Sequence, residues 1–245
     1  MVAVNSTLSI DMSRSWSAST VKITSITKSA PKLMGQAIWE DTTSSTPGFY
    51  IWGGHTPYGS ERNDIQKRSV WRFEADGQGG GSWTKKLSSN QEMQQSFVLP
   101  ECGAFTTAGN TGVFVGGTGS SWTDPNIGGG TVLVPGVVSF DMDTLTWRND
   151  TAPDELSPDG TLRDGTAAYA PTFGPNGLVF VLGGVTYSLG TTTNTPDGTI
   201  DFSPVPFFDP VTRTWYRQPA TGQVPRSRKS FCSVGVQSPN GTYEM

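Results

Sequence analysis

Three segments of the chain share one pattern, a short run of apolar residues that ends in two consecutive glycines. The segments are Phe49–Gly54, Gly112–Gly117 and Gly177–Gly184. The runs lack the strict alternation of a half-exposed strand, so each predicts a β-strand that is buried on both faces. We expect these strands at about 48–53, 112–116 and 177–182. No segment predicts a long helix.

The glycine pairs recur at a nearly constant interval along the chain. The first glycines of successive pairs are 63 and 67 residues apart, and a tryptophan follows each pair after 30 to 32 residues. The pairs are Gly53 and Gly54, Gly116 and Gly117, and Gly183 and Gly184. The tryptophans are Trp83, Trp147 and Trp215, and Trp16 occupies a related segment near the N-terminus. A fixed period with several strands per unit is typical of a β-propeller.

Each repeat predicts one four-stranded blade. The apolar strand is the second, the third carries an aromatic–Asp pair such as Phe140 and Asp141, and the fourth starts at the tryptophan. We expect Phe231–Val236 to be the first strand of a further blade. The tryptophans should fill the wedge between adjacent blades. The double glycines should allow positive φ and a close approach to the neighbouring blade; a phosphate-binding loop would require a helix after them.

The blades predict one propeller domain over residues 1–245. Full blades are expected at about 34–90, 98–152 and 163–220, with partial blades at about 7–23 and 226–245. Two arrangements are compatible with this division. The chain is either part of a longer six- or seven-bladed ring, or its two partial blades combine to close a four-bladed ring.

These motifs together resemble the kelch repeat. An apolar strand ending in Gly-Gly, an aromatic–Asp pair and a tryptophan about six residues later carry the resemblance, and Pro225–Phe231 is similar to the Pro-Arg opening of a kelch unit. The chain looks most like the kelch-repeat ectodomains of filamentous fungi. The resemblance implies an all-β, kelch-type propeller of four-stranded blades, as in the central domain of galactose oxidase, here as an incomplete ring.

Composition limits the classes of partner. The net charge is −4, and only 16% of the residues are charged. Nucleic-acid binding normally needs a concentrated basic face, so no nucleic-acid partner is expected. No run approaches the 18 apolar residues of a membrane span, so none is expected within this chain.

The sequence offers few candidates for catalysis or metal binding. A copper-radical oxidase similar to galactose oxidase would need paired histidines, whereas His55 is the single histidine. We therefore predict no catalytic residue, metal or cofactor. Asp124, Asp154 and Glu155 are interpreted as solvated turn residues. Cys102 and Cys232 are expected to be unpaired and mostly buried, because they lie in first strands separated by a whole blade.

The long loops after the glycine pairs are the candidates for binding. They span residues 55–67, 118–135 and 185–204 and should emerge on one rim of the ring. Tyr58, Trp122 and Tyr187 lie at similar places in them. Aromatic side chains on a rigid scaffold suit recognition of a protein or a glycan. The alternative is that each ring packs over its own loop.

Two function classes follow, with two possible locations. The first is a non-catalytic scaffold that binds a protein or glycan partner through these loops; the second is the propeller of a secreted copper-radical oxidase whose catalytic residues lie outside this chain. Possible N-glycosylation sites occur at Asn5, Asn149 and Asn240. With the fungal resemblance they favour an extracellular or cell-surface location, and a cytoplasmic adaptor is the alternative.

Overall fold

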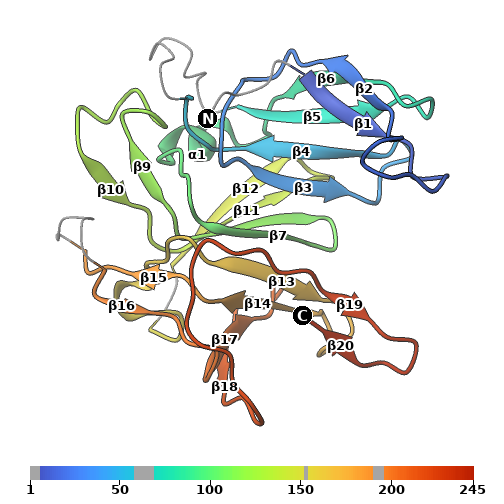
Figure 1. The fold of residues 1–245 in the computed structure, drawn as a ribbon. Helices are drawn as coiled ribbons and strands as arrows, with labels where there is room; N and C mark the ends of the chain where they lie inside the picture. Colours follow the sequence, from blue (N-terminus) through green and yellow to red (C-terminus); the bar gives the residue numbers. More distant parts are fainter. Residues whose placement is uncertain (1–5, 58–68, 152–153, 190–195) are drawn as a thin grey trace.

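The computed structural model describes residues 6–57, 69–151, 154–189 and 196–245, which are almost entirely β (Figure 1). Three four-stranded antiparallel sheets form most of it. The first contains β3 (Ala37–Asp41), β4 (Gly48–Trp52), β5 (Val70–Ala75) and β6 (Gly81–Lys86). The second contains β7 (Ala104–Ala108), β8 (Thr111–Val115), β11 (Val137–Asp141) and β12 (Thr146–Asp150). The third contains β13 (Thr166–Ala170), β14 (Leu178–Leu182), β17 (Val205–Phe208) and β18 (Trp215–Gln218).

Shorter elements lie at the ends of the chain and in the loops. β1 (Ser6–Ile10) pairs with β2 (Ile23–Thr27), and β19 (Val236–Gln237) pairs with β20 (Tyr243–Glu244). β9 (Thr118–Ser120) pairs with β10 (Thr131–Leu133), and β15 (Val185–Thr186) pairs with β16 (Gly198–Thr199). Among the described residues, the helical elements are α1 (Gln91–Ser96) and a 3₁₀ turn at Pro158–Gly160.

The predicted fold class is confirmed, because several four-stranded antiparallel sheets with consecutive strands are consistent with a kelch-type β-propeller. The predicted apolar strands correspond to β4, β8 and β14, with ends that agree within one residue. Each occupies the second place in its sheet, between the first and third strands.

The ends of the chain depart from the predicted strands. Phe231–Val236 was expected to form a first strand, but regular pairing begins only at Val236. A long first strand needs a second strand of similar length, and its partner β20 has only two residues. The β1–β2 and β19–β20 pairs form separate two-stranded sheets rather than one shared blade.

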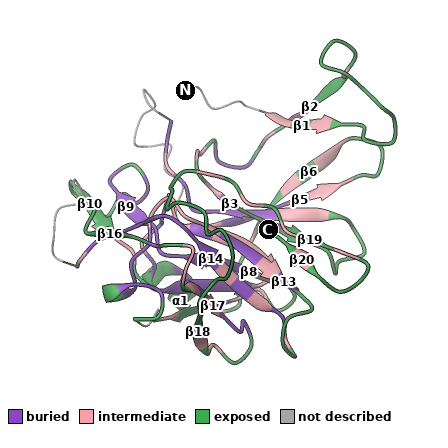
Figure 2. Cartoon of the chain, turned by 60° about the horizontal axis from the view of Figure 1, so that its bottom comes forward, coloured by how far each residue is buried: buried purple, intermediate pink, exposed green. Residues whose placement is uncertain are grey.

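The core forms two clusters of buried side chains, which we call seams, each between two neighbouring sheets. Figure 2 colours the buried residues purple and shows that the β1–β2 pair has none. In the first seam, between the first two sheets, Trp39, Trp52 and Trp147 are each 1% exposed or less and contact one another. The second seam, between the second and third sheets, contains Val113, Val179 and other buried apolar side chains. Aromatic side chains of this size contribute large buried areas, so the seams hold the sheets together.

The four repeated tryptophans differ in burial. Trp147 is enclosed in the first seam, whereas Trp83 and Trp215 are half-buried against Phe73 and Phe208 respectively. The expectation that Trp16 fills a wedge between blades is wrong, since it is 47% exposed. Trp16 lies in the loop between β1 and β2 and precedes β2 by several residues, so no sheet positions its ring.

The double glycines join each sheet to the next repeat. All six have φ between +56° and +100°. A Cβ on the first glycine of a pair would lie 2.5–2.7 Å from a carbonyl oxygen of the following repeat, and the amide of the second glycine donates to that same oxygen at 2.7–2.9 Å. The three acceptors are the carbonyls of Pro100, Leu162 and Arg228. Only glycine permits both this positive φ and this close approach. We call the combination of the packed first glycine and the amide–carbonyl hydrogen bond of the second glycine the interlock.

The repeated spacing between the aromatic–Asp pair and the tryptophan has a local cause. Asp141 accepts hydrogen bonds from the backbone amides of Asp143 and Thr144, which fixes the turn between β11 and β12. Asp209 makes the same two bonds in the turn between β17 and β18. The carboxylate thereby sets the register in which the following tryptophan enters the fourth strand.

Candidate functional site

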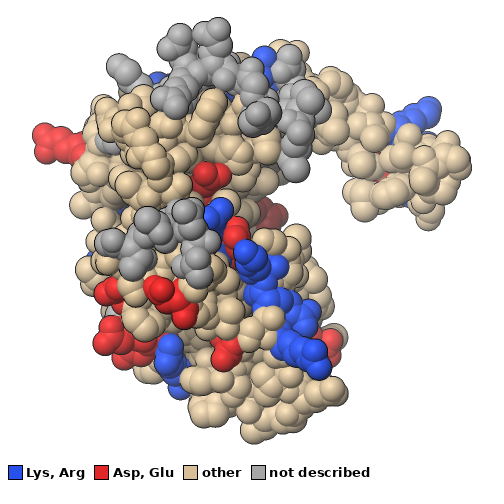
Figure 3. Space-filling model, turned by 60° about the vertical axis from the view of Figure 1, so that its left-hand side comes forward, with Lys and Arg blue, Asp and Glu red and all other residues tan. Residues whose placement is uncertain are grey.

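The segments that follow the glycine pairs project on one side of the molecule. The β9–β10 and β15–β16 hairpins both lie at the left of Figure 1, and we call this side the rim. Figure 3 turns it forward and shows a largely uncharged surface with Lys and Arg gathered in one band. Tyr58, the first predicted rim aromatic, lies outside the described residues.

Trp122 is held at the rim by two neighbouring loops. Its backbone carbonyl accepts from the amide of Thr56 at 3.0 Å and from the Thr56 hydroxyl at 3.3 Å. Its own amide donates to the Ser120 hydroxyl at 3.2 Å. The Trp122 side chain is 38% exposed. Backbone contacts from two repeats therefore fix a tryptophan whose ring is accessible to solvent.

His55 and Glu101 form a charge pair beside this tryptophan. The backbone of His55 pairs with that of Met34 in an isolated antiparallel β-bridge, and the backbone of Glu101 pairs with that of Thr118 in another. The same backbone contact therefore positions both side chains. The imidazole Nδ1 lies 2.5 Å from the Glu101 Oε2, with both side chains partly buried. Glu101 raises the pKa of His55 above its ordinary value, although burial of the imidazole acts in the opposite direction.

These groups surround a cavity of about 180 Å³, which we call the Trp122 pocket. Its lining residues are His55, Thr56, Glu101, Ser120 and Trp122. An aromatic side chain thus shares a concave site with a titratable pair and two hydroxyl groups. Apolar pockets with a few convergent polar groups and a perturbed pKa are the usual form of a ligand site.

Tyr187, the third predicted rim aromatic, does not lie on the surface. It is 4% exposed, and its backbone is bonded in both directions to the Thr161 hydroxyl, at 2.6 and 2.9 Å. The prediction of an exposed contact is wrong for this residue, because the two bonds hold its segment against the preceding loop. The alternative expectation, an aromatic ring that is packed inside the molecule, agrees with the burial of Tyr187.

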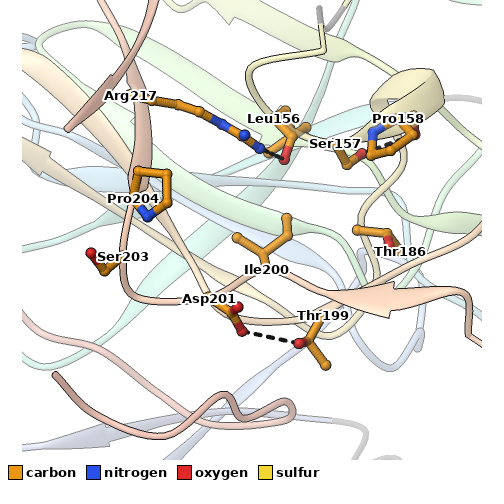
Figure 4. A pocket seen from close by; sticks show the side chains of 10 residues that line it. All are labelled: Leu156, Ser157, Pro158, Thr186, Thr199, Ile200, Asp201, Ser203, Pro204 and Arg217. Carbon is orange, nitrogen blue, oxygen red and sulfur yellow. Dashed lines mark hydrogen bonds between the residues drawn. The ribbon is translucent and has the colours of Figure 1, made fainter. Parts of the chain in front are cut away.

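A second pocket of about 160 Å³ lies near the third sheet (Figure 4). Arg217 enters it from β18 and donates to the backbone carbonyls of Glu155 and Leu156. Thr199 donates to Asp201 at 3.1 Å, and the Ser157 hydroxyl donates to the Thr161 carbonyl at 2.6 Å. Its polar groups are thus engaged in holding the loops together, which makes it a weaker candidate than the Trp122 pocket.

The two cysteines and Asp124 carry ionisable side chains outside the lining of the Trp122 pocket. Cys102 and Cys232 are both free thiols. Burial, with Glu101 and Asp164 nearby, raises the pKa of Cys102 to about 11. Cys232 is exposed, contrary to the prediction, because the segment around it lacks a covering sheet. Asp124 is also not a solvated turn residue, since it is fully buried and accepts from the amides of Leu99 and Asn126.

Two of the possible glycosylation sites are accessible. Asn149 lies on β12 and Asn240 lies in the turn before β20, and both are exposed. The Asn240 side chain accepts from the amide and hydroxyl of Thr242 at 3.2 and 2.9 Å. Asn5 lies outside the described residues.

Metal binding and membrane insertion would each need a specific arrangement of residues. Within residues 6–57, 69–151, 154–189 and 196–245, no group of three or more His, Cys, Asp or Glu side chains is arranged to hold a metal ion. In the same part of the chain, no helix has the length and apolar character of a membrane span.

Sequence reasoning found Trp122 but missed Glu101 and Thr56. Glu101 directly follows Pro100, whose carbonyl accepts the interlock hydrogen bond from the Gly54 amide. Arg163 occupies the corresponding position in the next repeat. Aligning the repeats at this position would have identified Glu101 as a neighbour of the segment after the glycines. Thr56 carries no comparable signal, because its role depends on a backbone contact to another repeat.

Comparison with known proteins identifies one informative relative. A kelch repeat-containing protein of Arthroderma benhamiae is 22% identical over 274 aligned positions. The alignment covers 96% of this chain and 38% of that relative, so the chain spans less than two-fifths of its length. No family model matches the chain. This likeness, with the four-stranded sheets, is consistent with a kelch-type propeller.

Proposed function

We propose that this protein is a non-catalytic kelch-type scaffold that binds a partner protein through its rim. The observation that carries the proposal is the Trp122 pocket, in which an accessible tryptophan is fixed by Thr56 and Ser120. Tryptophan is enriched among the residues that dominate binding energy, and rigid positioning lowers the entropy lost on association. The relative's name, a kelch repeat-containing protein, is compatible with such a scaffold.

The oxidase alternative has less support from the residues of this chain. It requires paired histidine ligands, whereas His55 is the single histidine and lies against Glu101. A carboxylate at this distance favours the protonated imidazole, which does not ligate a metal.

The test of the proposal is partner capture from extracts of the source organism, with the captured proteins identified by mass spectrometry. Trp122→Ala should reduce capture of a confirmed direct partner at least tenfold. Trp16→Ala is the matched control, because Trp16 is also exposed but lies in the β1–β2 loop. Equal capture by the two variants would remove the rim tryptophan from the binding surface.

We further propose an extracellular or cell-surface location. The exposed Asn149 and Asn240 support it, since glycan attachment requires an accessible acceptor. The intact mass of the protein from its source should fall on enzymatic removal of N-glycans. An unchanged mass would favour the cytoplasmic adaptor instead. An Asn149→Gln and Asn240→Gln double variant is the control, because its mass should fall less or not at all on the same treatment.

A further inference from the structure

We propose that the Trp122 pocket binds one neutral sugar ring, which makes a glycan the group that the rim recognises. This inference rests on the proposed function, because it names the chemistry read by the same pocket. A glycoprotein partner and a free polysaccharide would present the same ring, and the test separates these two sources.

The size of the pocket limits its occupant to one small unit. Its volume of about 180 Å³ is below the range of about 300–1,000 Å³ that accommodates drug-sized ligands. A single pyranose ring or a single amino-acid side chain is compatible with this volume. The choice between them depends on the chemistry of the lining.

The lining combines one tryptophan with four polar residues. Trp122 is 38% exposed, and the other residues that line the pocket are His55, Glu101, Thr56 and Ser120. A pyranose ring matches this division, since it has an apolar C–H face and a polar edge of hydroxyl groups. An apolar side chain would cover the His55–Glu101 pair without replacing its water, which is unfavourable.

The charge of the pocket favours a neutral occupant. With His55 protonated, the His55–Glu101 pair carries no net charge, and the raised pKa of His55 extends this state toward higher pH. The imidazolium has a second N–H donor and the carboxylate has a second acceptor oxygen. Neighbouring sugar hydroxyls, which both donate and accept, can pair with the two groups. A Lys or Arg side chain would instead meet the imidazolium, and a carboxylate would meet Glu101.

The test titrates the purified protein with oligosaccharides of glucose, mannose and N-acetylglucosamine and follows the signals of the imidazole by NMR. His55 is the single histidine, so its resonances need no assignment. We expect saturable binding of at least one series, with shifts at His55. Trp122→Ala should weaken binding at least tenfold, Glu101→Gln should weaken it several-fold, and Trp16→Ala should leave it unchanged.

Several results would overturn the inference. One is the absence of saturable binding by all three series, and another is binding that Trp122→Ala leaves intact. A third is preferential binding of a lysine- or arginine-containing peptide that strengthens as pH rises and His55 loses its proton. In each case, loss of partner capture by Trp122→Ala would still support the proposed function, so the two hypotheses fail separately. Capture that persists after glycans are stripped from the partner also contradicts the inference, whereas capture that is lost identifies the glycoprotein source.

Discussion

Replacing Gly116 by alanine tests whether the interlock holds neighbouring repeats together. Gly116 has φ +67°, and a Cβ there would lie 2.5 Å from the Leu162 carbonyl oxygen and 2.7 Å from the Leu162 Cβ. The obstructing atoms belong to the chain close to its backbone, so they cannot rotate away. Gly109 is a matched control with φ +59°, where a Cβ would meet no atom within 4 Å.

The two substitutions separate conformational strain from steric contact. A left-handed alanine costs roughly 1–2 kcal/mol, and forcing extra atoms into a packed site costs about 1–3 kcal/mol more. We therefore expect Gly109→Ala to lower the free energy of unfolding by about 1 kcal/mol and Gly116→Ala by about 3 kcal/mol. At roughly 2–4 °C per kcal/mol for a chain of this length, the Tm should fall by about 3 °C and about 9 °C respectively.

Circular dichroism of the purified variants, on heating and in urea, measures both changes. The m-value should be the same for all three proteins, because a change in it would indicate a different unfolding reaction. Equal losses in the two variants would show that the close approach to Leu162 adds nothing to the left-handed strain, and the account of the interlock given above would then be incorrect.

Three further predictions concern the core, a buried ion pair and the thiols. Trp147→Ala should lower stability to urea by about 3–5 kcal/mol, because it empties the centre of the first seam. Burial alone would raise the pKa of Asp41, but hydrogen bonds from Ser44 and the ion pair with Arg72 hold it below its ordinary value of 3.8. The stability that Asp41 contributes is therefore present above about pH 4 and is lost as pH falls through the lowered pKa. Asp41→Asn should lower the free energy of unfolding at pH 7 by about 3–5 kcal/mol and should weaken its dependence on pH below about pH 4. An unchanged dependence on pH in this range would contradict the role given to Asp41. At pH 8 an aromatic disulfide reagent should modify Cys232 rapidly and Cys102 slowly, since Cys232 is exposed and the pKa of Cys102 is about 11; equal rates would contradict this.

Local patterns made the sheets predictable from the sequence. The apolar runs of β4, β8 and β14 mark strands that are buried on both faces, and the glycines after them mark where the chain must bend. The turn chemistry of Asp141 and Asp209 fixed the spacing to the tryptophans. Each of these signals depends on neighbours within a few residues, so a single sequence is enough to reveal it.

Features that depend on distant contacts were not predictable in this way. Tyr187 and Trp122 occupy similar places after a glycine pair, and each has a backbone bond to a threonine hydroxyl of another segment, yet Tyr187 is buried and Trp122 is exposed. The pairing of His55 with Glu101 joins two repeats, so it can be inferred only from an alignment of the repeats and not from the residues beside either side chain. Trp16 ends a segment similar to those before Trp147 and Trp215, but the next strand, β2, begins only at Ile23, so Trp16 lies in a loop.

The interlock also has a consequence for how the molecule opens. Each sheet is joined to the next repeat by an amide–carbonyl bond and a packed glycine, so coupling passes mainly between nearest neighbours. The second sheet is packed on both flanks, within both seams, whereas no residue of β1 or β2 is buried. Amide hydrogens of β8 and β11 should consequently exchange with solvent most slowly, and protection should decline outward along the array. A break at one interlock would then divide the molecule into two units that open independently.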